Sequence, residues 1–477
     1  MSAPTAAPAG RRWLGLALIA TAQFVVIMDT SIIGVALPDM QAALGFTPES
    51  LSWVFNAYVV AFGGLLLLGG RLSDLLGARK VFVSGWLILA VGSVLAGAAG
   101  NVGLEIAGRA VQGAGAALIA PAALSLLMAL FGGTAELPRA FAVYGAAAPI
   151  GGTAGVFLGG VLTEWASWPW VFYITVPIAA LVVVLTPGAL PAVAGGRGSV
   201  DVGGAITGTV GLAALVYGVV RAPEAGWAAV ETLVALGAGV VLLAAFFVIQ
   251  ARSRQPLLRL GIFRTPQLGA ANLAQLLLGA AWVPMWFFLN LYLQQVLGAG
   301  AFAAGAALLP MTVLIVLGMT LVAPRLLARF GARALIVGGF GFLAAGLGWL
   351  AFARPDGSYV VDVLPASLVA AFGMALAFVP SLGTAIGAAR PEETGVASGL
   401  VNTSYQIGSA VGLAALTVLS STVAAGAIDP AALTSGYSAA FIGAGVVAAA
   451  GGVVTLAALR TRRGAEAAEP EPELVAG

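Results

Sequence analysis

Fourteen long apolar segments follow one another along almost the whole chain, and they constrain its fold more than any other feature. Each is long enough to cross the hydrocarbon core of a bilayer, which needs about 20 predominantly apolar residues. A spanning segment must satisfy its own backbone hydrogen bonds, so helices are the expected form. We therefore predict an all-α membrane protein with fourteen transmembrane helices. Their approximate limits are 13–37, 51–70, 81–99, 104–130, 138–162, 169–187, 202–220, 228–249, 268–294, 304–323, 333–352, 363–386, 396–422 and 437–458.

The composition agrees with this prediction and excludes several classes of function. Charged residues make up 8% of the chain, against about 25% in a soluble domain. The chain has no cysteine and no histidine, which excludes disulfides, thiolate or histidine metal sites and a Ser-His-Asp triad. It has no phosphate-binding loop of the type G-x-x-x-x-G-K-S/T either. We therefore expect neither an enzyme nor an ATP-driven pump, no cofactor and no metal. The net charge of +2 gives no reason to expect a nucleic-acid partner.

The cations alternate between the two sides of the predicted helices, and this alternation gives an orientation. If the N-terminus is cytoplasmic, only Arg221 and Arg354 lie outside, and only Arg109 lies within a helix. Both termini are then cytoplasmic, as expected for a multi-pass protein of the cytoplasmic membrane. The remaining cations all lie on the inner side: Arg11, Arg12, Arg71, Arg79, Lys80, Arg139, Arg197, Arg252, Arg254, Arg259, Arg264, Arg325, Arg329, Arg333, Arg390, Arg460, Arg462 and Arg463.

A short internal repeat divides the chain into two halves. The stretch 71–79, after the second segment, shares five of its nine residues with the stretch 325–333, after the tenth. Chance similarity between two arginine-rich turns is the alternative explanation. If the repeat is real, the first six and the last six helices form two bundles separated by two inserted helices. The expected parts are 1–190 for the first bundle, 191–255 for the inserted helices, 256–460 for the second bundle and 461–477 for a disordered tail.

The first copy of the repeat belongs to the pattern G-x-L-x-D-x-x-G-x-R, which runs from Gly70 to Arg79 and contains Asp74, Gly77 and, at its first variable position, Arg71. Gly70 permits close backbone approach and Gly77 permits a turn. This pattern resembles the signature loop between helices 2 and 3 of the major facilitator superfamily of secondary transporters. The resemblance implies two six-helix bundles around a central cavity, and a role for these five residues in conformational switching. An ordinary cytoplasmic turn is the alternative, but it does not explain the spacing of the two glycines and the acid.

One carboxylate lies deep in the first apolar segment, and no other is expected so far inside an apolar run. Asp29 is about 12 Å below the outer end of its helix, at 1.5 Å per residue. Burial disfavours the charged form of a carboxylate, so Asp29 can serve as a proton carrier in a chain without histidine. The run 28–38 also resembles the helix 1 signature of the fourteen-helix drug:proton antiporter branch, an acid followed by small polar residues and V-A-L-P. A neutral Asp29 that only fixes packing is the alternative.

Two further motifs lie in the fourth and fifth segments. Arg109 and Gln112 share a helical face and resemble the R-x-x-Q-G-x-G motif of helix 4. We expect Arg109 to act with Asp29 in proton coupling, although a structural cation bound to backbone carbonyls is the alternative. In the fifth segment, glycines at spacing four form a smooth face suited to a tight crossing. This segment resembles the antiporter motif, but lacks its proline. Gln112 and these glycines are predicted to take part in conformational switching: Gly151, Gly155 and Gly159.

Polar and aromatic side chains gather on two segments of the second half. In the ninth segment they recur every three or four residues, and in the thirteenth they resemble the G-L-x-N-T-x-x-Q-x-G run of the antiporter branch. Amide and aromatic groups on facing helices suit a broad, apolar, often cationic ligand. Interhelical hydrogen bonding is the alternative. The predicted substrate-binding residues are Asp29, Asn272, Gln275, Trp282, Trp286, Asn290, Asn402 and Gln406.

The resemblance implies a proton-coupled secondary transporter that exports small amphipathic drugs or antibiotics by alternating access. An exporter of one metabolite or self-made antibiotic is the alternative within transport. A receptor with a transporter fold that does not transport is the alternative outside it. The expected partners are the small-molecule substrate, protons and the lipid bilayer, and we expect a monomer.

Overall fold

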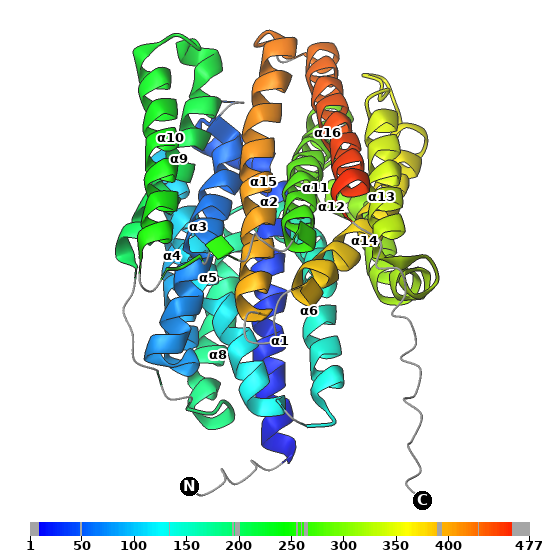
Figure 1. Ribbon diagram of the computed structural model, residues 1–477. Coiled ribbons are helices and arrows are strands. Elements are labelled where there is room, and N and C mark those ends of the chain that lie inside the picture. Colours follow the sequence, from blue (N-terminus) through cyan, green and yellow to red (C-terminus); the bar gives the residue numbers. More distant parts are fainter. Residues whose placement is uncertain are drawn as a thin grey trace, which may run out of the picture.

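The computed structural model describes residues 9–47, 50–132, 134–192, 195, 201–253, 256–258, 260–261, 266–388, 394–427 and 429–459. Over these ranges the protein is helical, without a strand (Figure 1). Thirteen of its helices are long and apolar enough to cross a membrane, and one of these runs over 50 residues from Ala301 to Leu350. A straight helix of that length would measure about 75 Å, but its backbone is not helical at Gly331. The break separates two crossings, so the prediction of fourteen is confirmed.

The first six crossings form one bundle, which we call the N half. At its centre α5 packs against α3 and α4, while α1 packs against α6. The elements are α1 (Ala9–Ser31) continued by α2 (Ile33–Leu44), a short 3₁₀ turn η1 (Ser50–Ser52), α3 (Trp53–Leu76), α4 (Ala78–Gly97), α5 (Val102–Phe131), α6 (Leu137–Trp165), and α7 (Trp170–Tyr173) continued by α8 (Thr175–Ala189).

The next two crossings, α9 (Val202–Ala225) and α10 (Val230–Arg252), pack mainly against each other at one edge of the molecule (Figure 1). α9 also contacts α3 and α15, so it bridges the two larger bundles. Only 11% of the spanning part of α10 is buried. Its long apolar surface therefore has no protein partner in a single copy and suits contact with lipid.

The last six crossings form the C half, in which α13 packs against α14 and α16, and α11 against α15. The elements are α11 (Pro266–Leu291) with η3 (Tyr292–Val296), α12 (Ala301–Leu317) with η4 (Gly318–Val322), α13 (Ala323–Leu350), η5 (Tyr359–Val363) with α14 (Leu364–Ala388), α15 (Thr394–Ala424) and α16 (Pro430–Ala458). The domain boundary predicted at 190 follows the end of α8. Those at 255 and 460, and the tail 461–477, lie outside the described residues.

The internal repeat has a structural counterpart. Gly77, between α3 and α4, has φ 92 and ψ 130, and Gly331 in the second copy has φ 77 and ψ 164. Residues with a side chain rarely adopt a positive φ, so each copy needs glycine there. Eight residues later the helices cross closely in both copies. A Cβ on Gly85 would lie 2.9 Å from a carbonyl oxygen of α5, and one on Gly339 would lie 2.7 Å from a carbonyl oxygen of α14. Equal geometry at equal spacing argues against chance similarity.

We call the end of the bundle where α1 begins the near end, and the opposite end the far end. The N and C halves meet closely towards the far end. A Cβ on Gly160, near the end of α6, would lie 2.8 Å from the backbone of Phe302 in α12. A Cβ on Gly305 would lie 2.7 Å from the carbonyl oxygen of Val156. Such close backbone contact leaves no room for a substrate between α6 and α12 at this level.

Candidate functional site

Asp29 lies in the last turn of α1 and its side chain is fully buried. The side chains of the next two residues bond back to the helix backbone. The hydroxyls of Thr30 and Ser31 donate to the carbonyl oxygen of Ile27, at 2.7 and 3.1 Å. Back-bonding of this kind tends to bend helices, and α1 gives way to α2 at Ile32. The carboxylate is therefore held directly before the junction of two helical segments.

A closed hydrogen-bond network joins this carboxylate to α5, α3 and α4. The Arg109 guanidinium donates through Nη1 to Asp29 at 3.1 Å and to the Gln112 side chain at 2.7 Å. Its Nε donates to the carbonyl oxygen of Val54 at 2.8 Å. Gln112 Nε2 donates to the other Asp29 oxygen at 3.1 Å and to Ser93 at 2.8 Å. The structure thus brings together Asp29, Arg109 and Gln112, the three polar residues that the sequence placed in helices 1 and 4.

Aromatic rings complete the surroundings of the guanidinium. The Arg109 Cζ atom lies 4.6 Å from the ring centre of Tyr58 and 5.9 Å from that of Phe172, distances at which a cation and a ring attract each other. Arg109, Asp29 and Gln112 are all 0% exposed. Removing one partner of a buried ion pair leaves an uncompensated charge, so a change of charge on Asp29 must alter the bonds of Arg109.

The glycine face of α6 lies directly against α1 on both sides of Asp29. A Cβ on each glycine would come within 2.8 Å of a backbone oxygen of the first crossing, so a side chain would force the helices apart. This confirms the predicted tight crossing and identifies α1 as the neighbour. The distances are 2.3 Å from Gly151 to Phe24 O, 2.8 Å from Gly155 to Met28 O and 2.6 Å from Gly159 to Ile32 O.

The predicted close approach at Gly70 is wrong. A Cβ on Gly70 would meet only Pro121, at 3.8 Å, which is an ordinary contact, whereas a Cβ on Gly69 would lie 2.0 Å from the Ala117 carbonyl oxygen. Both glycines are directed towards α5, but only at Gly69 do the two backbones come into close contact. The pattern gave the right helix, but the neighbouring glycine makes the contact.

The other predicted switch residues lie at the near end of the N half. Gly77 forms the turn between α3 and α4, as expected. Arg79 donates to the carbonyl oxygen of Leu190 at 3.3 Å, which ties this turn to the chain after α8. Arg71 is half-buried, whereas Asp74 is exposed and its side chain has no hydrogen bond or ion pair with a described residue. Among the described residues, the turn is therefore held by Arg79.

Two of the predicted substrate residues make hydrogen bonds within the C half. Asn272 accepts from Ser404 of α15 at 2.9 Å and donates to the carbonyl oxygen of Leu268 at 2.8 Å. Gln275 donates to Ser381 of α14 at 2.9 Å. These contacts are those expected of the alternative interpretation, interhelical hydrogen bonding.

The remaining predicted substrate residues of α11 and α15 are spread along the boundary between the halves. Asn290 is buried, donates to the Trp286 carbonyl oxygen at 2.9 Å and lies against Gly34 of α2. Trp286 is half-buried and Trp282 is 7% exposed. In α15, the Cβ of Gln406 lies against Gly63 of α3, and Asn402 is exposed. The structure does not gather this set around one cavity.

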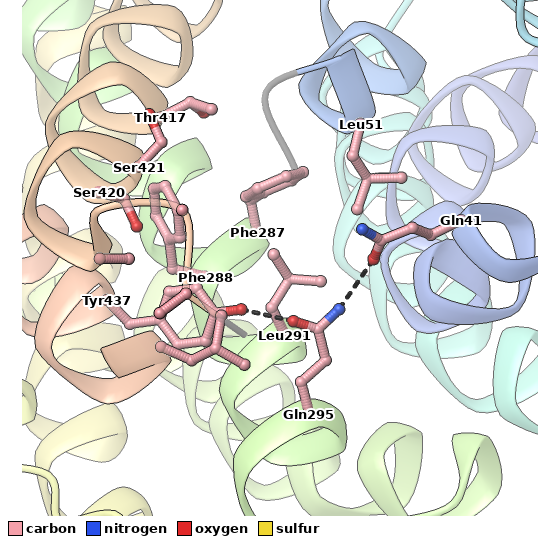
Figure 2. A pocket seen from close by; sticks show the side chains of 14 residues that line it. Gln41, Leu51, Phe287, Phe288, Leu291, Gln295, Thr417, Ser420, Ser421 and Tyr437 are labelled. Atoms are coloured by element: carbon pink, nitrogen blue, oxygen red, sulfur yellow. Dashed lines mark hydrogen bonds between the residues drawn. The ribbon is translucent and has the colours of Figure 1, made fainter. Parts of the chain in front are cut away.

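A cavity of about 380 Å³ lies between the halves at the far end (Figure 2). This volume falls within the range of small-molecule sites. Gln295 lines this cavity and connects two of its walls. It donates to Gln41 of α2 at 3.0 Å and accepts from Tyr437 of α16 at 2.6 Å. None of the lining residues was predicted from the sequence. They come from six helical elements and from the loop after α15, and they follow no motif. They are Gln41, Leu51, Phe287, Phe288, Leu291, Gln295, Thr417, Ser420, Ser421, Ala424, Gly426, Ala427, Leu433 and Tyr437.

The structure also buries a carboxylate that was not predicted from the sequence. Glu105, in the first turn of α5, is 0% exposed. Its position near the start of an apolar segment made it look superficial, but the surrounding helices cover it. Its spacing of four from Arg109, which puts the two on one helical face, was the available signal.

Comparison with known proteins places this architecture in a family. Residues 19–413 match the model of the Major Facilitator Superfamily. The chain belongs to this superfamily of membrane transporters. The nucleoside transporter whose crystal structure carries the D323A change superposes on it with a TM-score of 0.65 at 16% identity, over 94% of this chain and 100% of that chain. A bacterial homologue of the human drug peptide transporters gives 0.66 at 18% identity, over 94% and 98%. Both likenesses concern the fold.

The sequence relatives are closer. This transporter is 41% identical to the cephamycin export protein of Amycolatopsis lactamdurans, over 92% of this chain and 91% of that protein. It is 38% identical to the puromycin resistance protein of Streptomyces alboniger, over 88% and 84%. It is also 31% identical to the tetracenomycin C resistance and export protein of Streptomyces glaucescens, over 87% and 77%.

Proposed function

We propose that this transporter exports small amphipathic antibiotics or drugs across the cytoplasmic membrane in exchange for protons. The observation that carries the proposal is the buried network of Asp29, Arg109 and Gln112 in the N half. Ionisable residues inside a membrane are costly and are kept for function by default. The names of the relatives, which refer to export of or resistance to cephamycin, puromycin and tetracenomycin C, support the choice of substrate class.

Two contacts of α2 support a link between the charge of Asp29 and the far end of the molecule. Protonation of Asp29 removes the negative charge that Arg109 faces, so the bonds between α1 and α5 weaken. The helix that follows Asp29 is α2, and α2 carries two contacts to the C half: Val35 O accepts from Gln294 at 3.0 Å and Gln41 accepts from Gln295 at 3.0 Å. Movement of α2 after protonation therefore favours opening of the far end, which is one half of an alternating-access cycle.

A narrow substrate range is the alternative to export of many compounds. Each of the three relatives above is named for a single antibiotic, so an exporter dedicated to one metabolite or self-made antibiotic is the second candidate. A panel of puromycin, a cephamycin and the lipophilic cation ethidium in a drug-sensitive host separates the two: protection against one compound supports the dedicated exporter.

We also propose that the near end faces the cytoplasm and that the protein works as a monomer. Arg71, Arg79 and Lys80 lie in the near-end turn between α3 and α4, and Arg252 ends α10 at the same end. Arg354 lies in a far-end loop, after α13. An excess of cations in cytoplasmic loops is the usual rule for inner-membrane proteins.

The test compares wild type with Asp29→Asn in proteoliposomes under an imposed pH gradient, with puromycin and ethidium as probes. The variant cannot change its charge, so gradient-driven transport is expected to fall to the level of protein-free vesicles. Asp356→Asn serves as the control, because this acid is exposed in a far-end loop. Unchanged gradient-driven transport in Asp29→Asn would remove this residue from the mechanism.

A further inference from the structure

Glu105 is a buried acid that the proposed exchange mechanism leaves unused. Its side chain is 0% exposed, and neither carboxylate oxygen has a hydrogen-bond partner among the described residues. Buried polar groups are nearly always hydrogen-bonded, and a buried charge is nearly always paired. A fully buried acid without a hydrogen-bond partner is therefore costly, and a function would explain its presence.

A guanidinium with one unused nitrogen, that of Arg109, lies one helical turn away. Arg109 follows Glu105 by four residues in α5, so the two side chains share a face and their Cα atoms are about 6 Å apart along the axis. Arg109 uses Nε and Nη1 for Val54, Gln112 and Asp29, while its Nη2 has no partner. Arg109 therefore has a second buried carboxylate one turn away on its own helix, but among the described residues it is bonded only to Asp29.

Among the described residues, the charges that act on Glu105 are few. The charged groups that act on it electrostatically are Arg109 and Asp29. The other charged side chains of the packed helices lie elsewhere: those of α3 and α4 are at the near end, in the 70–80 turn, and α8 has none. On α6, Arg139 lies in the first turn, at the near end, whereas Glu164 is at the far end but is exposed and faces Phe302 of α12. On α1, Arg11 and Arg12 lie in the first turn, also at the near end.

The sum of charges decides the protonation state. Two carboxylates and one guanidinium would leave a net charge of −1 in a site from which water is excluded, and one bound proton makes the site neutral. Since Arg109 already pairs with Asp29, the proton belongs on the carboxylate without a partner. We propose that Glu105 is a second proton-binding residue. It takes up a proton from the far end, and it alternates with Asp29 as the ion-pair partner of Arg109.

The exchange, which rests on the proposed proton coupling at Asp29, conserves charge at each step. The O–H bond of Glu105 breaks and an O–H bond forms at Asp29, with water admitted at the far end as the carrier. The guanidinium moves in the opposite sense, from Asp29 to Glu105, so the three groups stay neutral together. Glu105 is suited to the outer role because it lies in the first turn of α5, whereas Asp29 lies deeper, level with Arg109 and Gln112.

The first test does not depend on transport. Infrared spectroscopy of the purified full-length protein reports the C=O stretch of protonated carboxylic acids. At neutral pH this band should be present in wild type and lost in Glu105→Gln. It should also be lost in Asp29→Asn, because Arg109 then balances the charge of Glu105 without a bound proton. Glu231→Gln is the matched control, because Glu231 also lies in the first turn of a helix, α10, but is exposed. A band that is unchanged in Glu105→Gln would overturn the proposal.

The second test separates proton movement from substrate movement in proteoliposomes, with puromycin as the probe. Glu105→Gln should lose uptake driven by a pH gradient but keep exchange of labelled for unlabelled puromycin, which needs no net proton transfer. Glu105→Asp, which restores a carboxylate, should recover part of the driven uptake. Full driven uptake by Glu105→Gln, or equal loss of driven uptake and exchange that Glu105→Asp does not rescue, would show that Glu105 is only structural. Failure of the proposed function is distinct, because then wild type itself shows no driven uptake.

Discussion

Arg109 is the residue on which the buried network depends, because it bonds to three acceptors on different helices of the N half. Its planar guanidinium reaches Val54 O, Gln112 and Asp29 at once. An ammonium has the same charge but neither the planar geometry nor the reach to keep these contacts together. At this site charge alone is therefore not sufficient.

We predict that Arg109→Lys abolishes gradient-driven efflux although the charge is kept. The lysine can pair with Asp29 or bind the backbone, but it cannot couple the two. Efflux of puromycin from proteoliposomes should fall to the level of protein-free vesicles. The control is Arg221→Lys, at an exposed pair with Glu231, since such surface pairs contribute only about 0–1 kcal/mol. Wild-type efflux by Arg109→Lys would mean that the network needs only a positive charge.

Residue by residue, the sequence showed the parts of this site that stand out against an apolar background. Asp29 and Arg109 were predicted because a charge in the middle of an apolar run is costly wherever the helix lies. Glu105 was missed because its burial depends on neighbours, α3 and α4, that bring their covering side chains from elsewhere in the chain. The local sequence pattern cannot distinguish a first helical turn that is exposed from one that neighbouring helices bury.

At the scale of helices, glycine spacing predicted where backbones touch, but not always at which glycine. The spacing of four in α6 correctly indicated a close crossing, now seen against α1. In α3 the motif pointed to Gly70, whereas Gly69 makes the contact. The repeat of the turn glycines was clearer, because a positive φ at Gly77 and Gly331 is a property of the backbone itself.

We predict that Gly151→Ala destabilises the protein and that Gly145→Ala, on the same helix, does not. A Cβ on Gly151 would lie 2.3 Å from Phe24 O, whereas one on Gly145 meets nothing within 4 Å. Overpacking of this kind costs about 1–3 kcal/mol, and alanine in an open helical position is favoured by about 0.5–1 kcal/mol. Thermal unfolding in detergent measures both variants. Equal melting temperatures would contradict the close packing of α6 on α1.

At the scale of the whole molecule, the number of crossings followed from the lengths of apolar runs, because a membrane imposes that length on every helix. The contacts between halves did not follow from sequence. Gln295, Gln41 and Tyr437 meet from three elements far apart in the chain, and nothing in their local sequence marks them. The same holds for the cavity that they border (Figure 2).

The orientation of the molecule is testable because the chain has no cysteine. We predict that a cysteine at Gly100, exposed in the far-end loop between α4 and α5, reacts with an impermeant maleimide in intact cells. A cysteine at Ser253, after α10 at the near end, should react only after the membrane is permeabilised. The reverse pattern would place the termini outside.

The last prediction concerns the contact between α2 and η3 at the far end. If alternating access requires α2 to leave η3, then tying Gln41 to Gln295 must stop transport. In the double variant Gln41→Cys, Gln295→Cys, a flexible cross-linker with a reducible bond should abolish puromycin efflux, and reduction should restore it. The matched control joins Gln295→Cys to Tyr437→Cys, a contact inside the C half that need not break, and it should stay active when cross-linked. Transport by the cross-linked Gln41–Gln295 variant at the rate of its reduced form would show that the far end opens by a route that leaves this contact intact. The proton site would then have to act on the C half through α6 and α12, which are in close contact towards the same end.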